Sequence, residues 1–158
     1  MRQCMIGSVE PTDKDFTKNK WLHEVVNQIR QAYGQPKGKG LAARFVPIAS
    51  EDELGPPDRC PYNVADYVEK HPGSRGVRCF KVYAECTADH ATHVGAKAVM
   101  HYVVQCEDGK LLDVTCEPGD RRTFCVPANW FPDVADEQLR SCCAHMGGFV
   151  CGTAQRVQ

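Results

Sequence analysis

Apolar side chains recur at helical spacing in two early parts of the chain. The first predicts a helix over residues 18–33, with Thr17 as its N-cap. Its apolar face consists of Trp21, Leu22, Val25, Val26 and Ile29. A second helix is predicted to begin at Cys60, because Pro61 suits the first helical turn, and to end at residues 71–73, His-Pro-Gly. Cys60 is therefore expected at a helix N-terminus.

Alternation of apolar and polar residues, with β-branched and aromatic enrichment, predicts strands. A short apolar strand is expected at 41–48, and further strands at 76–86, 97–106, 110–116 and 122–126. These strands are expected to form one mainly antiparallel sheet.

Two shorter signals complete the pattern. Ser50 and Glu53 resemble a capping box, but Gly-Pro-Pro at 55–57 allows no more than one helical turn. Asp133 is a suitable N-cap for a last helix whose apolar face extends to Met146. The order of helices, strands and a helix predicts an α+β fold, with N-terminal helices packed on the sheet and a C-terminal helix.

Composition adds a domain count and excludes some partners. The 158 residues, 42% of them apolar, are enough for one domain that buries a core without metal or disulfide support. Nineteen basic and twenty acidic residues give a net charge of -1, so we expect no nucleic-acid partner.

The expected location follows from hydropathy and cysteine usage. No apolar run approaches the roughly 18 residues that span a bilayer, and residues 1–10 lack the apolar segment of a signal peptide. We therefore expect a cytoplasmic protein without a membrane partner, whose ten cysteines are reduced.

The candidate chemistry centres on three residues. A cysteine attacks as thiolate, which the positive end of a helix stabilises, and Cys60 is the cysteine best placed for this. Such a thiolate needs an imidazole to share its proton and a carboxylate to orient the ring. His101 and Asp113 lie on neighbouring predicted strands. Structural roles remain open beside this one: Cys60 as a capping residue, His101 in the core and Asp113 in a turn.

The turn between these strands decides whether His101 and Asp113 meet. A two-residue loop, Asp108-Gly109, places the two side chains on opposite faces of the sheet. A three-residue loop that includes Glu107, with Gly109 in the left-handed conformation, pairs Cys106 with Lys110 and places both side chains on one face. Both loops suit the Asp-Gly sequence.

The segments 100–104, MHYVV, and 107–115, EDGKLLDVT, resemble the end of a transglutaminase-like or papain-like cysteine hydrolase core. In such cores a strand with the histidine is followed by a turn and a strand that ends in Asp-x-Thr. The strand GVRCF at 76–80 is similar to the one that follows the nucleophile helix in these families. The resemblance covers about residues 60–116, and it favours the three-residue loop.

The resemblance implies a cysteine-dependent acyl-transfer enzyme with Cys60, His101 and Asp113 as a catalytic triad. The implied substrate is a peptide or protein amide, and this chemistry needs no cofactor. The family commonly has Trp beside the nucleophile; here Pro61 follows Cys60, and Tyr62 is the nearest aromatic residue. Asn63, one helical turn from Cys60, is a further candidate to support the site.

A metal site is the chief alternative. Cys86, His90 and His93 carry sulfur and imidazole donors at a spacing that suits zinc. They predict a zinc-stabilised, non-catalytic binding or interaction module in place of an enzyme.

Overall fold

The computed structural model describes residues 6–9, 12–33, 44–87, 89, 92–115, 122–126 and 148–152, and these form an α+β fold. The helices are α1 (Asp13–Lys18), α2 (Lys20–Tyr33), the 3₁₀ turn η1 (Glu51–Glu53) and α3 (Cys60–Lys70). The strands are β1 (Ile6–Val9), β2 (Arg44–Pro47), β3 (Arg75–Thr87), β4 (His93–Gln105), β5 (Leu111–Leu112), β6 (Arg122–Val126) and β7 (Gly148–Gly152). The predicted fold class is thereby confirmed.

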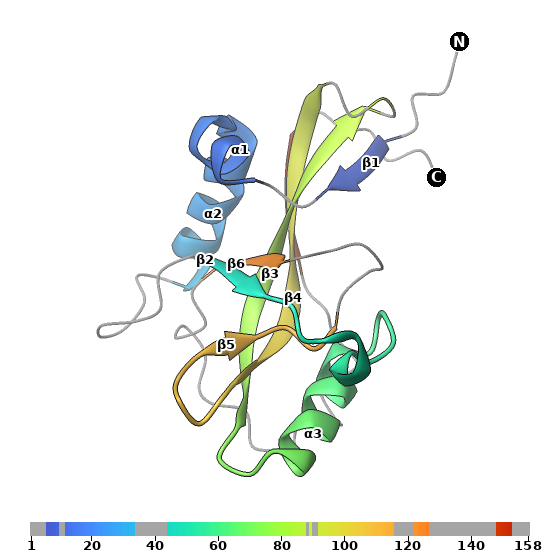
Figure 1. Cartoon of the computed structure of the whole chain (residues 1–158). Helices are drawn as coiled ribbons and strands as arrows, with labels where there is room; N and C mark the ends of the chain where they lie inside the picture. The colour runs from blue at the N-terminus through green and yellow to red at the C-terminus, as the bar shows by residue number, and fades with distance from the viewer. Residues whose placement is uncertain are drawn as a thin grey trace.

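The long antiparallel hairpin of β3 and β4 forms the centre of the sheet (Figure 1). The described strands follow the order β2-β6-β3-β4-β5, with β1 added to β3 and β7 added to β4, and each of these pairs is antiparallel. One edge of β4 pairs with β3. On the other edge, β7 pairs with Gly95–Val99 and β5 pairs with Val104 and Gln105, so residues 100–103 have no partner strand among the described residues. His101 lies in this gap.

The two ends of the strand order are joined. Ile48, just after β2, forms a parallel bridge with Asp113, just after β5. The Asp113 N–H donates to the Pro47 carbonyl at 2.9 Å, and the Ala49 N–H donates to the Asp113 carbonyl at 2.9 Å. Side chains from β2, β3, β4 and β5 form a small apolar cluster. Its buried members are Val46, Val77, Cys79, Val103 and Leu111.

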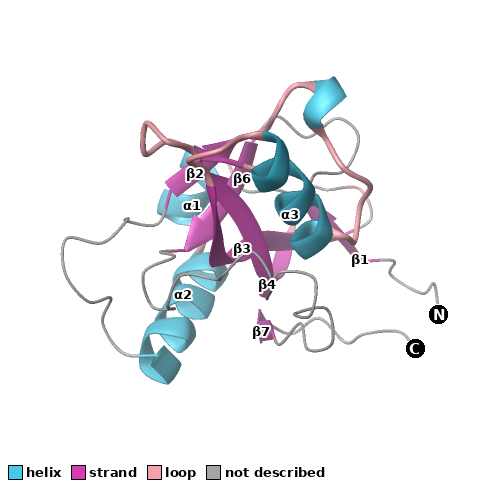
Figure 2. Cartoon of the chain, turned by 90° about the horizontal axis from the view of Figure 1, so that it is seen from below, coloured by secondary structure: helices cyan, strands magenta, loops and turns pink. Residues whose placement is uncertain are grey.

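Two helices pack on the other face of the hairpin, as their contacts show. Because the hairpin twists, α2 lies beside its upper part and α3 beside its lower part, on opposite sides of the strands (Figures 1 and 2). The apolar side of α2 packs on side chains such as Phe80 and Ala98, and that of α3 packs on Tyr102 and Val104. Met100 contacts both clusters, so the two helices share one continuous face of β4. Burial of a large apolar side chain such as Phe80 or Val104, both 0% exposed, contributes roughly 1.5–3 kcal/mol.

The start of the first long helix differs from the prediction. Thr17 is not its N-cap: Thr17 lies inside α1 and donates to the Lys14 carbonyl at 3.1 Å. Asn19 takes that role, since its Oδ1 accepts the N–H groups of Trp21 at 2.9 Å and Leu22 at 3.4 Å. Both residue types are good caps, and the sequence pattern does not rank two candidates that are so close together.

The strand predictions are right in type and uneven in extent. The strand at 122–126 is confirmed, and the single turn after Ser50 is confirmed as η1. The strand predicted at 110–116 is observed only as Leu111–Leu112, because Asp113 and Thr115 form isolated bridges to Ile48 and Gly55. Cys116 lies outside the described residues. β1 and β7 were not predicted, and the predicted C-terminal helix from Asp133 to Met146 lies outside the described residues.

The turn after β4 adopts the three-residue loop. Val104 pairs with Leu112, the Cys106 N–H donates to the Lys110 carbonyl at 2.8 Å, and the Gly109 N–H donates to the Cys106 carbonyl at 2.8 Å. Gly109 has a φ of +83°, in the left-handed region that favours glycine. This register places Asp113 on the same face as His101.

We expect Gly109→Ala to lower the free energy of unfolding by about 1–2 kcal/mol, because an L side chain is strained at this φ. A Cβ at Gly109 meets no other residue within 4 Å, apart from its chain neighbours. The loss therefore comes from strain in the local backbone and not from a clash with a distant residue. Chemical denaturation measures it, and Gly109→Asn is the control, because asparagine tolerates this conformation better. Equal stability of wild type and Gly109→Ala would contradict this account of the turn.

Candidate active site

The three residues singled out by chemistry come from three separate elements. Cys60 is the first residue of α3, His101 lies near the middle of β4, and Asp113 follows β5 directly. Their exposed fractions are 2%, 5% and 0%. The structure therefore gathers the three side chains in the interior, where charge interactions are stronger than in water.

His101 and Asp113 form a direct bond. The distance from His101 Nε2 to Asp113 Oδ2 is 2.9 Å. The second carboxylate oxygen of Asp113, Oδ1, accepts the N–H of Thr115 at 2.9 Å. Asp113 thus fills both roles that the sequence left open, since one oxygen orients the histidine and the other caps a local turn.

Cys60 lies close enough to the same imidazole to help raise its pKa. Because Asp113 holds Nε2, the ring nitrogen left for the thiol is Nδ1. Pro61 in the first turn of α3 provides no N–H, and no side chain caps the helix start. The thiol therefore sits at the positive end of a helix dipole, near the His101 imidazole.

The charge state of His101 follows from these neighbours. Burial by itself lowers the pKa of the imidazole, but the Asp113 carboxylate and its hydrogen bond, together with Cys60, raise that pKa to about 10. The favoured form of His101 at neutral pH is therefore the imidazolium, which holds a proton beside the thiol.

The two supporting candidates have different surroundings. Asn63 is buried, and its amide Nδ2 donates to the Pro56 carbonyl and to Thr115 Oγ1, each at 2.8 Å. Tyr62 is half-buried, with the guanidinium carbon of Arg59 5.1 Å from its ring centroid. Asn63 is thereby linked to the segment of the acid, and the described contact of Tyr62 is a cation–π pair with Arg59.

The sequence reasoning missed two neighbours of the site. Cys79 lies directly across from His101 in the β3–β4 register and is 1% exposed. Thr115 was part of the Asp-x-Thr pattern without a role of its own; it holds Asp113 and accepts from Asn63. The position of Cys79 follows only from the register of the strands. The role of Thr115 could have been predicted from the short Asp-x-Thr spacing, which suits a hydrogen bond from the Thr N–H to the Asp side chain.

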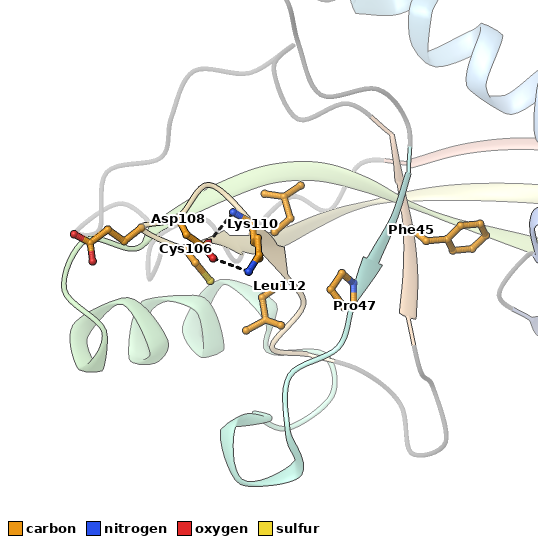
Figure 3. A pocket seen from close by; sticks show the side chains of 8 residues that line it. Phe45, Pro47, Cys106, Asp108, Lys110 and Leu112 are labelled. Carbon is orange, nitrogen blue, oxygen red and sulfur yellow. Dashed lines mark hydrogen bonds and ion pairs between the residues drawn. The ribbon is translucent and has the colours of Figure 1, made fainter.

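Two pockets are lined by residues of the same segments as these three residues. The larger, about 670 Å³, lies between Phe45 and Pro47 of β2 and the segments 106–108 and 110–112 (Figure 3). The smaller, about 260 Å³, is lined by Asn63 and other residues of α3 and of the segment before it. Neither is lined by Cys60, His101 or Asp113.

The predicted metal ligands are only partly described. Cys86 and His93 pair across β3 and β4, but Cys86 is buried in the apolar cluster under α2, and His90 lies outside the described residues. Within the described ranges, no three His, Cys, Asp or Glu side chains come together in a way that would hold a metal ion. The zinc site stays a prediction.

Two further findings bear on the class of protein. In the part of the chain that the structure describes, no helix has the length and apolar character needed to cross a membrane. No family model, no curated protein and no solved structure matches the chain. The geometry of the site is therefore the basis on which a function can be inferred.

The bond between His101 and Asp113 predicts a pH dependence of stability. The pKa of His101 is about 10 in the folded state against 6.5 for a free imidazole, so the proton stabilises the fold. This stabilisation is complete below about pH 6.5 and is lost as the pH rises towards about 10. We expect urea unfolding to show this loss in the wild type and much less of it in Asp113→Asn, which lacks the charge. Parallel pH curves for the two proteins would contradict the assignment.

Proposed function

We propose that this protein is a cysteine-dependent acyl-transfer enzyme that acts on a peptide or protein amide. The observation that carries the proposal is the buried His101–Asp113 bond of 2.9 Å, together with Cys60, which is near enough to help raise the pKa of the same imidazole. In this proposal Cys60 is the nucleophile, His101 carries the proton, and Asp113 orients the imidazole, as thiol catalysis requires.

In the first half of the reaction, Cys60 has given its proton to His101, and its thiolate Sγ forms a bond to the amide carbonyl carbon. The C–N bond breaks as the His101 imidazolium gives its proton to the leaving amine, and a thioester remains on Cys60. In the second half, His101 takes a proton from the acceptor, which attacks the thioester and releases the Cys60 thiolate. Water as acceptor gives a peptidase or amidase, and an amine gives a transglutaminase.

Burial supplies matched controls for this proposal. Cys60, Cys79 and Cys86 are 2%, 1% and 1% exposed, so a small alkylating reagent has equally poor access to each. Cys79 is also a direct cross-strand neighbour of His101. A selective reaction of Cys60 would therefore report its chemistry and not its exposure.

The test is the alkylation rate of each cysteine by iodoacetamide, read by peptide mass spectrometry at pH 6 and pH 9. We expect Cys60 to react at least about tenfold faster than Cys79 and Cys86 at pH 6, because an ordinary thiol is almost fully protonated there. We expect His101→Ala to remove this lead and Asp113→Asn to reduce it.

The opposite result also has a clear meaning. If Cys60 reacts no faster than Cys79 in a folded protein, the proposal of an acyl-transfer enzyme is wrong, and the fold serves as an interaction domain. If the lead is present, a labelled primary amine offered with a protein substrate separates the two acceptors. Incorporation of the label that is lost in Cys60→Ser indicates amine transfer, and release of a free carboxylate indicates hydrolysis.

A further inference from the structure

A chain of buried contacts connects the helix of Cys60 to the carboxylate of Asp113. Asn63, one turn along α3 and 6% exposed, uses both amide hydrogens: one for the Pro56 carbonyl and one for Thr115 Oγ1. Because α3 is a rigid element, the position of Asn63 fixes the position of Cys60 on the same helix.

The loop before α3 is pressed against Asn63. A Cβ placed on Gly55 would lie 2.0 Å from Asn63 Cγ, which is far inside contact distance. The Gly55 N–H also donates to the Val114 carbonyl at 2.9 Å, so this loop is tied to the segment after β5. Only glycine allows the loop to pass Asn63 at this distance.

Thr115 carries the connection to the acid. Its hydroxyl oxygen accepts from Asn63, and its backbone N–H donates to Asp113 Oδ1 at 2.9 Å. The other oxygen of Asp113 holds His101 at 2.9 Å. The contacts therefore run without a gap from α3 through Asn63, Thr115 and Asp113 to the imidazole.

We propose that Asn63, Gly55 and Thr115 are positioning residues that hold the Asp113 carboxylate in line with His101 and in register with Cys60. The proposal rests on the proposed function for its catalytic meaning, but its physical content is the orientation of the imidazole. None of the three would touch the substrate; they act through Asp113 and through α3.

Thr115→Val tests the hydroxyl with little change of shape. It removes the acceptor for Asn63 and keeps the backbone N–H that holds Asp113, whereas Thr115→Ser keeps both. Gly55→Ala is a second, independent variant, because its Cβ must displace the Asn63 side chain. Among the residues that the structure describes, the titratable groups that face His101 are Asp113, Cys60 from α3 and Cys79 from β3, and all three are unchanged in these variants.

The first readout is the titration of the His101 imidazole, followed by NMR on protein with ¹⁵N-labelled histidine. We expect the pKa of His101 to fall by about one unit, a roughly tenfold loss of proton affinity, in Thr115→Val and in Gly55→Ala. Thr115→Ser should titrate as the wild type does. A folded Thr115→Val or Gly55→Ala with the wild-type titration would overturn the inference, whatever its melting temperature.

The second readout is the alkylation rate of Cys60 at pH 6, which we expect to fall about tenfold in Thr115→Val and to recover in Thr115→Ser. This readout separates the two proposals. If wild-type Cys60 reacts no faster than Cys79, the proposed enzyme function fails, and the His101 titration alone decides whether these residues position the acid.

Discussion

A carboxylate and an imidazole that are both shielded from water are tolerable only as partners, because each buried charge alone has a large desolvation cost. Asp113 is wholly buried and His101 nearly so, and their bond of 2.9 Å joins them. This pair sets demands on the rest of the fold. β5 must pair with β4 in the observed register. After Leu112 the chain must pass from β4 to Ile48, to which Asp113 forms a bridge. The second carboxylate oxygen, Oδ1, needs a donor, which the Thr115 N–H provides.

The site is assembled from a local and a distant part. His101 and Asp113 belong to one hairpin whose turn is short and carries the glycine that its geometry requires. Cys60 is the first residue of α3, which packs on Tyr102 and Val104, on the face of β4 opposite to His101. The described partners of β4 on its second edge leave a gap at His101, and Cys60 on α3 helps to raise the pKa of this imidazole.

Much of the fold was predictable because its helices and strands obey their own periodicities. The apolar stripe of α2 and the alternation along β3 and β4 report directly which side chains face the core. The errors arose where two local solutions compete. Thr17 and Asn19 are both good caps. The strand expected at 110–116 stops at Leu112, because the segment after β2 offers Asp113 and Thr115 other partners. Local preference does not contain that information.

For the site, the sequence alone determined the residue types: a cysteine and a proline at a helix start, a histidine in an apolar strand, an Asp-Gly turn and an Asp-x-Thr segment. It left two turn registers open, because Asp-Gly suits both. The tertiary structure decided between the two registers. It also placed Cys60 near His101, paired Cys79 with His101 across the strands, and formed the hydrogen bond from Asn63 to Thr115. The physical reason is range: conformational preference acts over a few neighbouring residues, whereas contacts between side chains from separate elements depend on how the whole core packs.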